Sequence, residues 1–110
     1  MIQTTIYRTE SGRVQSFTIS GHALFANKGN DIVCAGASAV SIGAINSIIA
    51  LTGVEPEIEQ GESGFLRCVI PDNLTKDVQE KVQLLLEGMI VSLQTIERDY
   101  GKHIKITFKK

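Results

Sequence analysis

The sequence contains no tryptophan and only two prolines, and neither sign of charge dominates it. Aromatic side chains make up 5% of the 110 residues, too few for a platform on which nucleic-acid bases stack. Eleven basic and twelve acidic side chains leave a net charge of −1. Because proteins that bind nucleic acid normally carry a basic excess, we expect no direct nucleic-acid partner.

The N-terminus lacks a basic segment followed by a long apolar run, which is the pattern of an export signal. We therefore expect a cytoplasmic protein, in which the two cysteines, Cys34 and Cys68, stay reduced. The chain has the size of one domain, and hydrophobic residues make up 43% of it, which is ordinary for a globular protein. The composition thus predicts a single domain over residues 1–110.

Apolar residues that alternate with polar ones predict five strands. Their ranges are 2–7, 13–20, 54–59, 65–70 and 104–108. Pro56 and the glutamates around it place the third strand at a sheet edge, since proline cannot donate a hydrogen bond to a neighbouring strand. The longest connection, residues 21–30, predicts a loop, and we expect residues 23–30 to form a mobile lid over a site.

Two further segments predict helices. Residues 31–52 carry no charge after Asp31, which suits an N-cap, and Gly53 suits the end of a helix. Apolar residues surround this helix on every side, as in a core helix or a membrane span. Polar residues along it and the lack of a flanking basic cluster favour the core helix, and we expect no membrane partner.

Residues 74–100 repeat apolar side chains at spacings of three and four, which predicts a long amphipathic helix. Residues 71–73, Pro-Asp-Asn, precede it and offer a cap. The resulting order is ββαββαβ. It predicts an α+β fold, in which a mostly antiparallel sheet packs against the buried apolar helix and the long amphipathic helix.

Cys34 falls in the first turn of the uncharged helix, three residues after Asp31. Backbone N–H groups there have no intrahelical partner, and the helix dipole places a partial positive charge beside them. Both features favour the thiolate form of a cysteine, and the same N–H groups suit a developing oxyanion. The alternative is that Cys34 is a small core residue, and its position alone does not decide between the two.

His22 follows the second predicted strand directly after Gly21. The end of a strand and the start of the next helix commonly lie close together, so His22 and Cys34 are expected to be neighbours. A Cys–His pair is the usual means of activating a thiol. The alternative for His22 is an ordinary solvent-exposed histidine in a loop.

Asp31 and Ser38 flank Cys34 and are weaker candidates for a site. Asp31 either caps the helix, which we favour, or orients His22 as the carboxylate of a triad does. Ser38 lies one helical turn after Cys34 on the same face. It either approaches the site or is a small residue that lets a neighbouring strand come close.

The remaining cysteine and histidine are expected to stand apart from this site. Cys68 alternates with Leu66 and Ile70, which places it in the core, and His103 begins the last predicted strand, where we expect it to be exposed. The two cysteines and two histidines lack the compact spacing of structural zinc motifs. We therefore expect no metal and no other cofactor.

One segment of the sequence has a recognisable pattern. It reads Gly21-His22-Ala23, then a loop, then Asp31-Ile32-Val33-Cys34-Ala35 and small residues that include Ser38. This pattern closely resembles the ribosomal-processing cysteine protease family of Firmicutes and related bacteria, often called Prp. The resemblance extends to the size of the chain, the apolar helix and the stretch from Met89 to Ile96.

The resemblance implies a cysteine endopeptidase that removes the short N-terminal extension of large-subunit ribosomal protein twenty-seven. It implies cleavage after a short hydrophobic segment that ends in aromatic residues, with Cys34 as the nucleophile and His22 as general base and then general acid. It also implies a homodimer. The alternative is a non-catalytic module for ribosome assembly or protein interaction, and a thiol redox protein is a third interpretation, which lacks a resolving cysteine close to Cys34.

Overall fold

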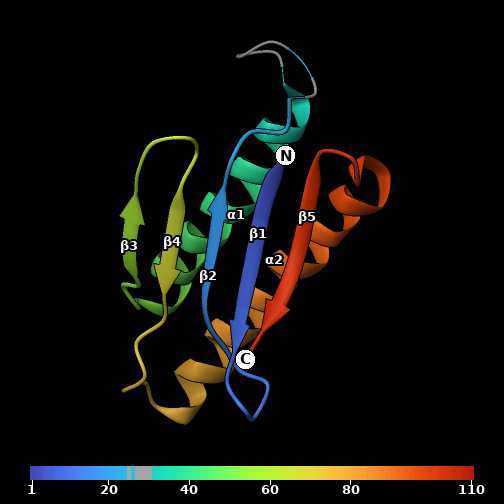
Figure 1. The fold of residues 1–110 in the computed structure, drawn as a ribbon. Helices are drawn as coiled ribbons and strands as arrows, with labels where there is room; N and C mark the ends of the chain where they lie inside the picture. The colour runs from blue at the N-terminus through green and yellow to red at the C-terminus, as the bar shows by residue number, and fades with distance from the viewer. Residues whose placement is uncertain (25, 27–30) are drawn as a thin grey trace.

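The structure, a computed structural model, describes residues 1–24, 26 and 31–110, and over these residues it contains five strands and two helices (Figure 1). They are β1 (Ile2–Arg8), β2 (Val14–Ser20), α1 (Ile32–Thr52), β3 (Glu57–Gln60), β4 (Leu66–Val69), α2 (Lys76–Tyr100) and β5 (Ile104–Lys109). The predicted α+β fold and its order, ββαββαβ, are confirmed. The predicted lid, residues 23–30, lies largely outside the described residues.

The five strands form one sheet in the order β3-β4-β2-β1-β5. All neighbours are antiparallel except β1 and β5, which run parallel with Ile2 beside Ile104. The predicted edge position of β3 is confirmed, but β3 begins at Glu57 rather than near residue 54. Pro56 directly precedes it, and a proline has no N–H group to pair with β4.

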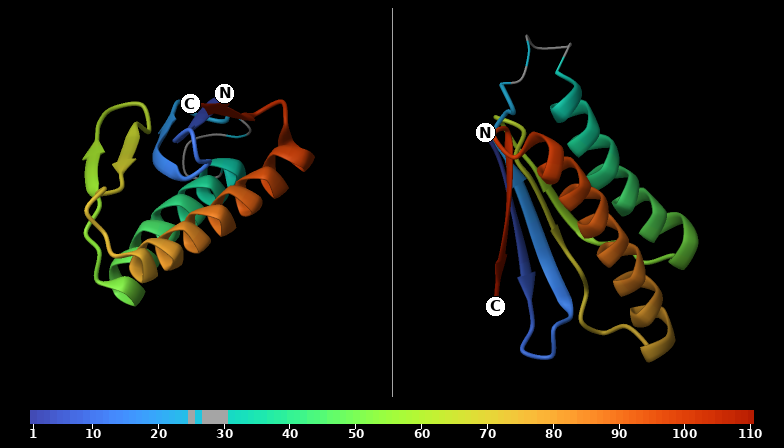
Figure 2. Two further views of the ribbon diagram at one scale, coloured as in Figure 1. Left: turned by 90° about the horizontal axis from the view of Figure 1, so that it is seen from below. Right: turned by 90° about the vertical axis from the view of Figure 1, so that its right-hand side faces the viewer.

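Both helices cover the same face of the sheet, and the opposite face carries no helix of the described chain (Figure 2). Alternate residues of the central strands point into the layer between sheet and helices. The core includes Ile6 and its cross-strand neighbour Phe17, and Cys68 lies beside Phe17 on β4. All three are fully buried, so the core position predicted for Cys68 is confirmed.

α2 is amphipathic as predicted and buries one stripe of apolar residues, Val82, Leu86, Met89, Ile90 and Leu93. Its start differs from the prediction. Thr75 is the N-cap, and its hydroxyl accepts a hydrogen bond from the N–H of Val78 at 3.4 Å. Residues 71–73 lie too far before the first turn to satisfy its N–H groups, so they do not cap the helix.

α1 is capped by Asp31 and ends at Gly53, which has the left-handed conformation (φ +74°) that favours glycine. Its burial differs from the expectation. The structure buries one face of α1, whereas Ile42 and Ile49 on another face are 41% and 37% exposed. The reason is that the domain has two layers, so α1 packs against α2 and the sheet and has no third layer on its outer side. By length and composition alone, α1 is apolar enough to cross a membrane.

We predict that Cys68→Ser lowers the free energy of unfolding by about 1–3 kcal/mol, because the hydroxyl would be buried among apolar side chains without a good partner. Cys68 is 0% exposed and has Phe17 beside it. Urea denaturation followed by circular dichroism measures the loss. Ser47→Ala, a change in an exposed hydrogen bond within α1, serves as the control. A Cys68→Ser variant as stable as the wild type would contradict the core assignment.

Candidate active site

The end of β2, the start of α1, the β3–β4 turn and the start of β5 all lie at the same end of the molecule (Figure 1). A cavity of about 500 Å³ opens there. It is lined by His22, Leu24, Ala26, Asp31, Cys34, Ala35 and Ser38. All four residues that the sequence singled out for a site therefore line one cavity.

Asp31 holds the start of α1 and the backbone of Cys34. Its Oδ1 accepts hydrogen bonds from the N–H groups of Val33 and Cys34, both at 3.0 Å. The predicted N-cap is therefore confirmed. The same contacts correct another expectation, because these two N–H groups already donate to Asp31 and do not stand free for an oxyanion.

The thiol of Cys34 has a different backbone donor, from across the loop. The N–H of Ala23 donates to Cys34 Sγ at 3.2 Å. Ala23 is buried and Cys34 is half-buried. An N–H aimed at sulfur stabilises negative charge on it, as hydrogen bonds to ionised groups do. This contact also brings the residue that follows His22 directly against the thiol.

Gly21 and the β3–β4 turn fix the backbone that precedes His22. Gly21 has φ +86°, and a Cβ at this position would overlap the carbonyl oxygen of Met1. Its N–H donates to the carbonyl oxygen of Ser63 at 2.8 Å. Gly64 packs so close that a Cβ there would lie 2.9 Å from the carbonyl oxygen of Gly21. Three segments of the chain therefore meet at the base of His22.

His22 itself is exposed and lines the cavity, whereas the next residue, Ala23, is buried. A second cavity of about 290 Å³ also contains His22, Cys34 and Ser38, and extends toward Phe65 at the end of the β3–β4 turn. The imidazole, the thiol and the serine are thus common to two adjoining cavities. An extended chain that passes from one cavity to the other would cross the thiol.

His103 differs from its prediction. It is half-buried rather than exposed, and its Nδ1 lies 2.9 Å from the carbonyl oxygen of Ala23. Neither Ala23 nor His103 was linked to Cys34 by sequence reasoning. The contacts run through backbone atoms or join residues about eighty positions apart, and a single sequence carries no signal for them. Among the described residues, no three His, Cys, Asp or Glu side chains gather as a metal site would require.

A thiol at a helix N-terminus, with an imidazole on the wall of the same cavity, is the arrangement of enzymes that attack a carbonyl carbon with sulfur. The fold and the cavity therefore define a small α+β thiol hydrolase.

Comparisons with known proteins agree with this class. The family described as cysteine protease Prp matches residues 1–105. A Bacillus subtilis (strain 168) protein named ribosomal processing cysteine protease Prp is 48% identical, over 97% of this chain and 96% of its own. A protein of the same name from Staphylococcus aureus (strain NCTC 8325 / PS 47) is 40% identical, over 99% and 100%.

Solved structures agree as well. The crystal structure of the essential ribosomal processing protease Prp from S. aureus, in complex with a covalently linked product peptide, superposes with a TM-score of 0.90 at 39% identity. The match covers 99% of this chain and 100% of that one. A second structure of the S. aureus protease, with a substrate peptide, gives a TM-score of 0.85 at 38% identity and the same coverage. This chain belongs to the Prp family of cysteine proteases.

We predict that iodoacetamide modifies Cys34 and leaves Cys68 intact in the folded protein at neutral pH. Burial raises the pKa of Cys68 to about 11, so at lower pH this thiol is protonated as well as inaccessible. Cys34 is half-buried and lines both cavities. Mass spectrometry should find one adduct on the native protein and two after denaturation. Equal labelling of both thiols in the native protein would refute the assignment.

Proposed function

We propose that this protein is an endopeptidase that removes the short N-terminal extension of large-subunit ribosomal protein twenty-seven in the cytoplasm. Cys34 is the nucleophile in this proposal, and His22 is the general base and acid. The observation that carries the assignment is the 3.2 Å hydrogen bond from Ala23 N–H to Cys34 Sγ. It places the residue that follows His22 in contact with the thiol. The substrate is supported by the relatives named ribosomal processing proteases.

The proposed reaction has two halves. His22 accepts the proton of the Cys34 thiol, and the thiolate attacks the carbonyl carbon of the peptide bond. The tetrahedral intermediate collapses as His22 gives its proton to the leaving amine, which leaves an acyl group on sulfur. A water molecule, deprotonated by His22, then attacks the acyl carbon, and His22 returns the proton to sulfur. The products are two shorter peptides and the original thiol.

Asp31 and Ser38 have supporting roles in this proposal. Asp31 holds the backbone of Cys34 through two hydrogen bonds to its Oδ1 and so fixes the direction from which the thiolate attacks. Ser38 is exposed and lines both cavities, where its hydroxyl is available to the backbone of a bound peptide. Neither side chain needs to exchange a proton with the substrate.

The two adjoining cavities support an extended polypeptide as the substrate. The larger one has Leu24 in its wall, a residue that is 78% exposed and has a positive φ of 57°. The smaller one offers Ile42 and Phe65. Such an apolar lining suits a hydrophobic segment before the cleavage point. Leucine seldom adopts this conformation, and such strain is concentrated at functional sites.

We predict that the purified protein cleaves a synthetic peptide that spans the extension and the first residues of the mature ribosomal protein. Cys34→Ala and Cys34→Ser should lose this activity by about three orders of magnitude or more, as removal of a nucleophile does. His22→Ala should be similarly impaired. Cys68→Ser, a thiol-to-hydroxyl change outside both cavities, is the matched control and should retain turnover.

Mass spectrometry of the products identifies the cleaved bond. Turnover by Cys34→Ala at the wild-type rate would show that Cys34 is not the nucleophile. The wild type could instead leave this peptide intact and cleave an unrelated hydrophobic peptide. That result would contradict the proposed substrate, although the protein would still be a protease.

We also propose that the protein is a homodimer. Beyond the two cavities, the exposed side of α1 carries no charge and includes Ala39, Asn46, Ile49 and Ala50. Ile49 and Ala50 lie three and four residues after Asn46 and therefore on the same side of the helix. An exposed apolar helix face without charge is typical of an interface, whose core is depleted of charged residues.

The expected outcome is that Ile49→Glu shifts the protein from dimer to monomer in sedimentation equilibrium, because a carboxylate would be buried without a partner. Leu84→Glu is the matched control: Leu84 is also exposed, at 74%, but lies on α2. A wild-type protein that is monomeric, or an Ile49→Glu variant that remains dimeric, would contradict this interface.

A further inference from the structure

The two backbone polar groups of Ala23 are held from opposite directions. Its N–H donates to Cys34 Sγ at 3.2 Å, and its carbonyl oxygen lies 2.9 Å from Nδ1 of His103. A carbonyl oxygen only accepts hydrogen bonds, so Nδ1 of His103 carries the proton and donates it. Ala23 is 2% exposed, which leaves little access for water to replace either partner.

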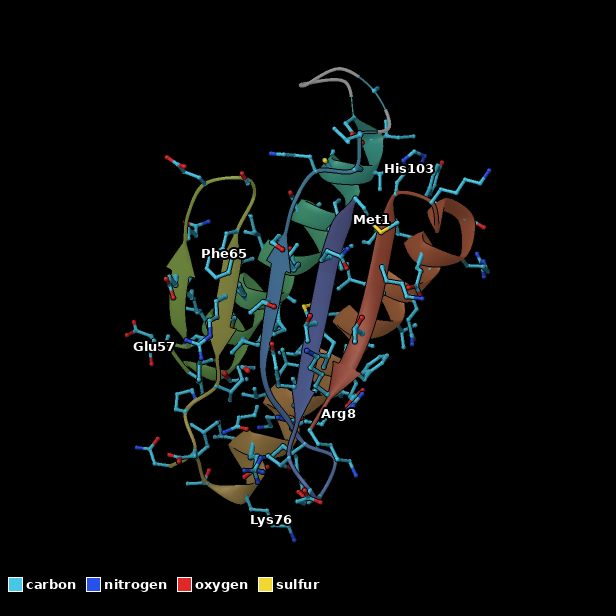
Figure 3. The ribbon with its side chains drawn as sticks, in the orientation of Figure 1. Met1, Arg8, Glu57, Phe65, Lys76 and His103 are labelled. Atoms are coloured by element: carbon cyan, nitrogen blue, oxygen red, sulfur yellow. The ribbon has the colours of Figure 1, made fainter. Side chains whose placement is uncertain are left out.

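His103 is well placed to be a fixed donor. It stands in the short turn between α2 and β5, at the end of the molecule where α1 begins (Figure 3). Its own N–H donates to the carbonyl oxygen of Tyr100 at 2.8 Å, and its carbonyl oxygen accepts from the N–H of Ile2 at 2.9 Å. The backbone of His103 is therefore tied to both α2 and β1, and these elements belong to the core.

Ala23, by contrast, lies three residues beyond the end of β2 and belongs to no strand or helix. Two residues before it, the N–H of Gly21 donates to the carbonyl oxygen of Ser63. Beyond Ala23 the chain passes through Leu24, which has a positive φ of 57° and is largely exposed. The hydrogen bond from His103 therefore holds the carbonyl side of Ala23, next to the exposed Leu24.

We infer that His103 is a positioning residue for the Cys34 thiolate. Its ring holds the carbonyl oxygen of Ala23, which keeps the N–H of Ala23 aimed at Sγ and keeps the adjacent His22 on the cavity wall. His103 touches neither the thiol nor the peptide in this inference, and it exchanges no proton with them. The inference rests on the proposed roles of Cys34 and His22, and it adds a residue that acts on the geometry of both.

The test compares two substitutions of similar polarity. In His103→Asn the amide nitrogen lies the same number of bonds from the backbone as Nδ1, so it can still donate to the carbonyl of Ala23. In His103→Gln the amide lies one bond farther out and matches Nε2 instead. His103→Ala removes the donor altogether, and Lys102→Ala, a change at the exposed neighbouring position, is the control.

Two rates are measured: kcat for the precursor peptide and the second-order rate constant for alkylation of Cys34 by iodoacetamide. His103→Ala and His103→Gln should lower both by about 10- to 100-fold, the loss that a misplacement of roughly 1 Å produces, with KM little changed. His103→Asn should retain most of both rates, and Lys102→Ala all of them. Circular dichroism verifies that each variant is folded.

Equal kcat values for folded His103→Asn and His103→Gln would overturn the inference, and so would a loss of kcat without any loss of alkylation rate. Because both amide variants keep a polar side chain, this comparison decides the matter even if His103→Ala does not fold. A failure of the proposed catalytic roles can be distinguished from a failure of this inference. In that case Cys34→Ala would turn over the peptide at the wild-type rate, whatever the rates of the His103 variants.

Discussion

The arrangement of the site depends on the absence of a side chain at position 21. Any Cβ there would overlap the carbonyl oxygen of Met1, and the φ of +86° is a conformation that glycine adopts freely. This turn sends the chain from the end of β2 across the start of β1 toward α1. The N–H of Gly21 is then fixed by Ser63, and Ala23 reaches Cys34. The turn at Gly21 therefore directs the backbone of His22 and Ala23 to the thiol.

α1 serves the fold and the site with different parts of its surface. Its first turn presents Cys34 and is held by Asp31, while residues such as Val33 and Ile48 bury one side against α2 and the sheet. Most of the stability of such a helix comes from packing rather than from its intrinsic propensity. The position of the thiol is therefore coupled to the core of the whole domain. This coupling suits a reaction in which small displacements of the nucleophile are costly.

Local signals in the sequence predicted much of this structure. Asp31 and Gly53 marked the ends of α1 because capping chemistry is local, and the alternating strands gave the order of the elements. The cap of α2 was misplaced because several residues before it, Asp72 and Asn73 among them, can cap a helix, and only the backbone conformation selects Thr75. The full burial expected of α1 also failed, since a helix that is apolar all round does not reveal how many layers surround it.

That His22 and Cys34 would lie near each other was predictable because both belong to one short motif, and the structure places both on the walls of the same two cavities. The contacts of Ala23 with Cys34 and His103 were not, because each joins a side chain to a backbone atom of Ala23, and any residue type would offer that atom. One of these distant contacts has a consequence for biosynthesis. β1 pairs with β5, and the N–H of Ile2 donates to the carbonyl oxygen of His103, just before β5. During translation β1 has no partner on that side until β5 leaves the ribosome, so the contact of His103 with Ala23 forms only after all five strands have been made.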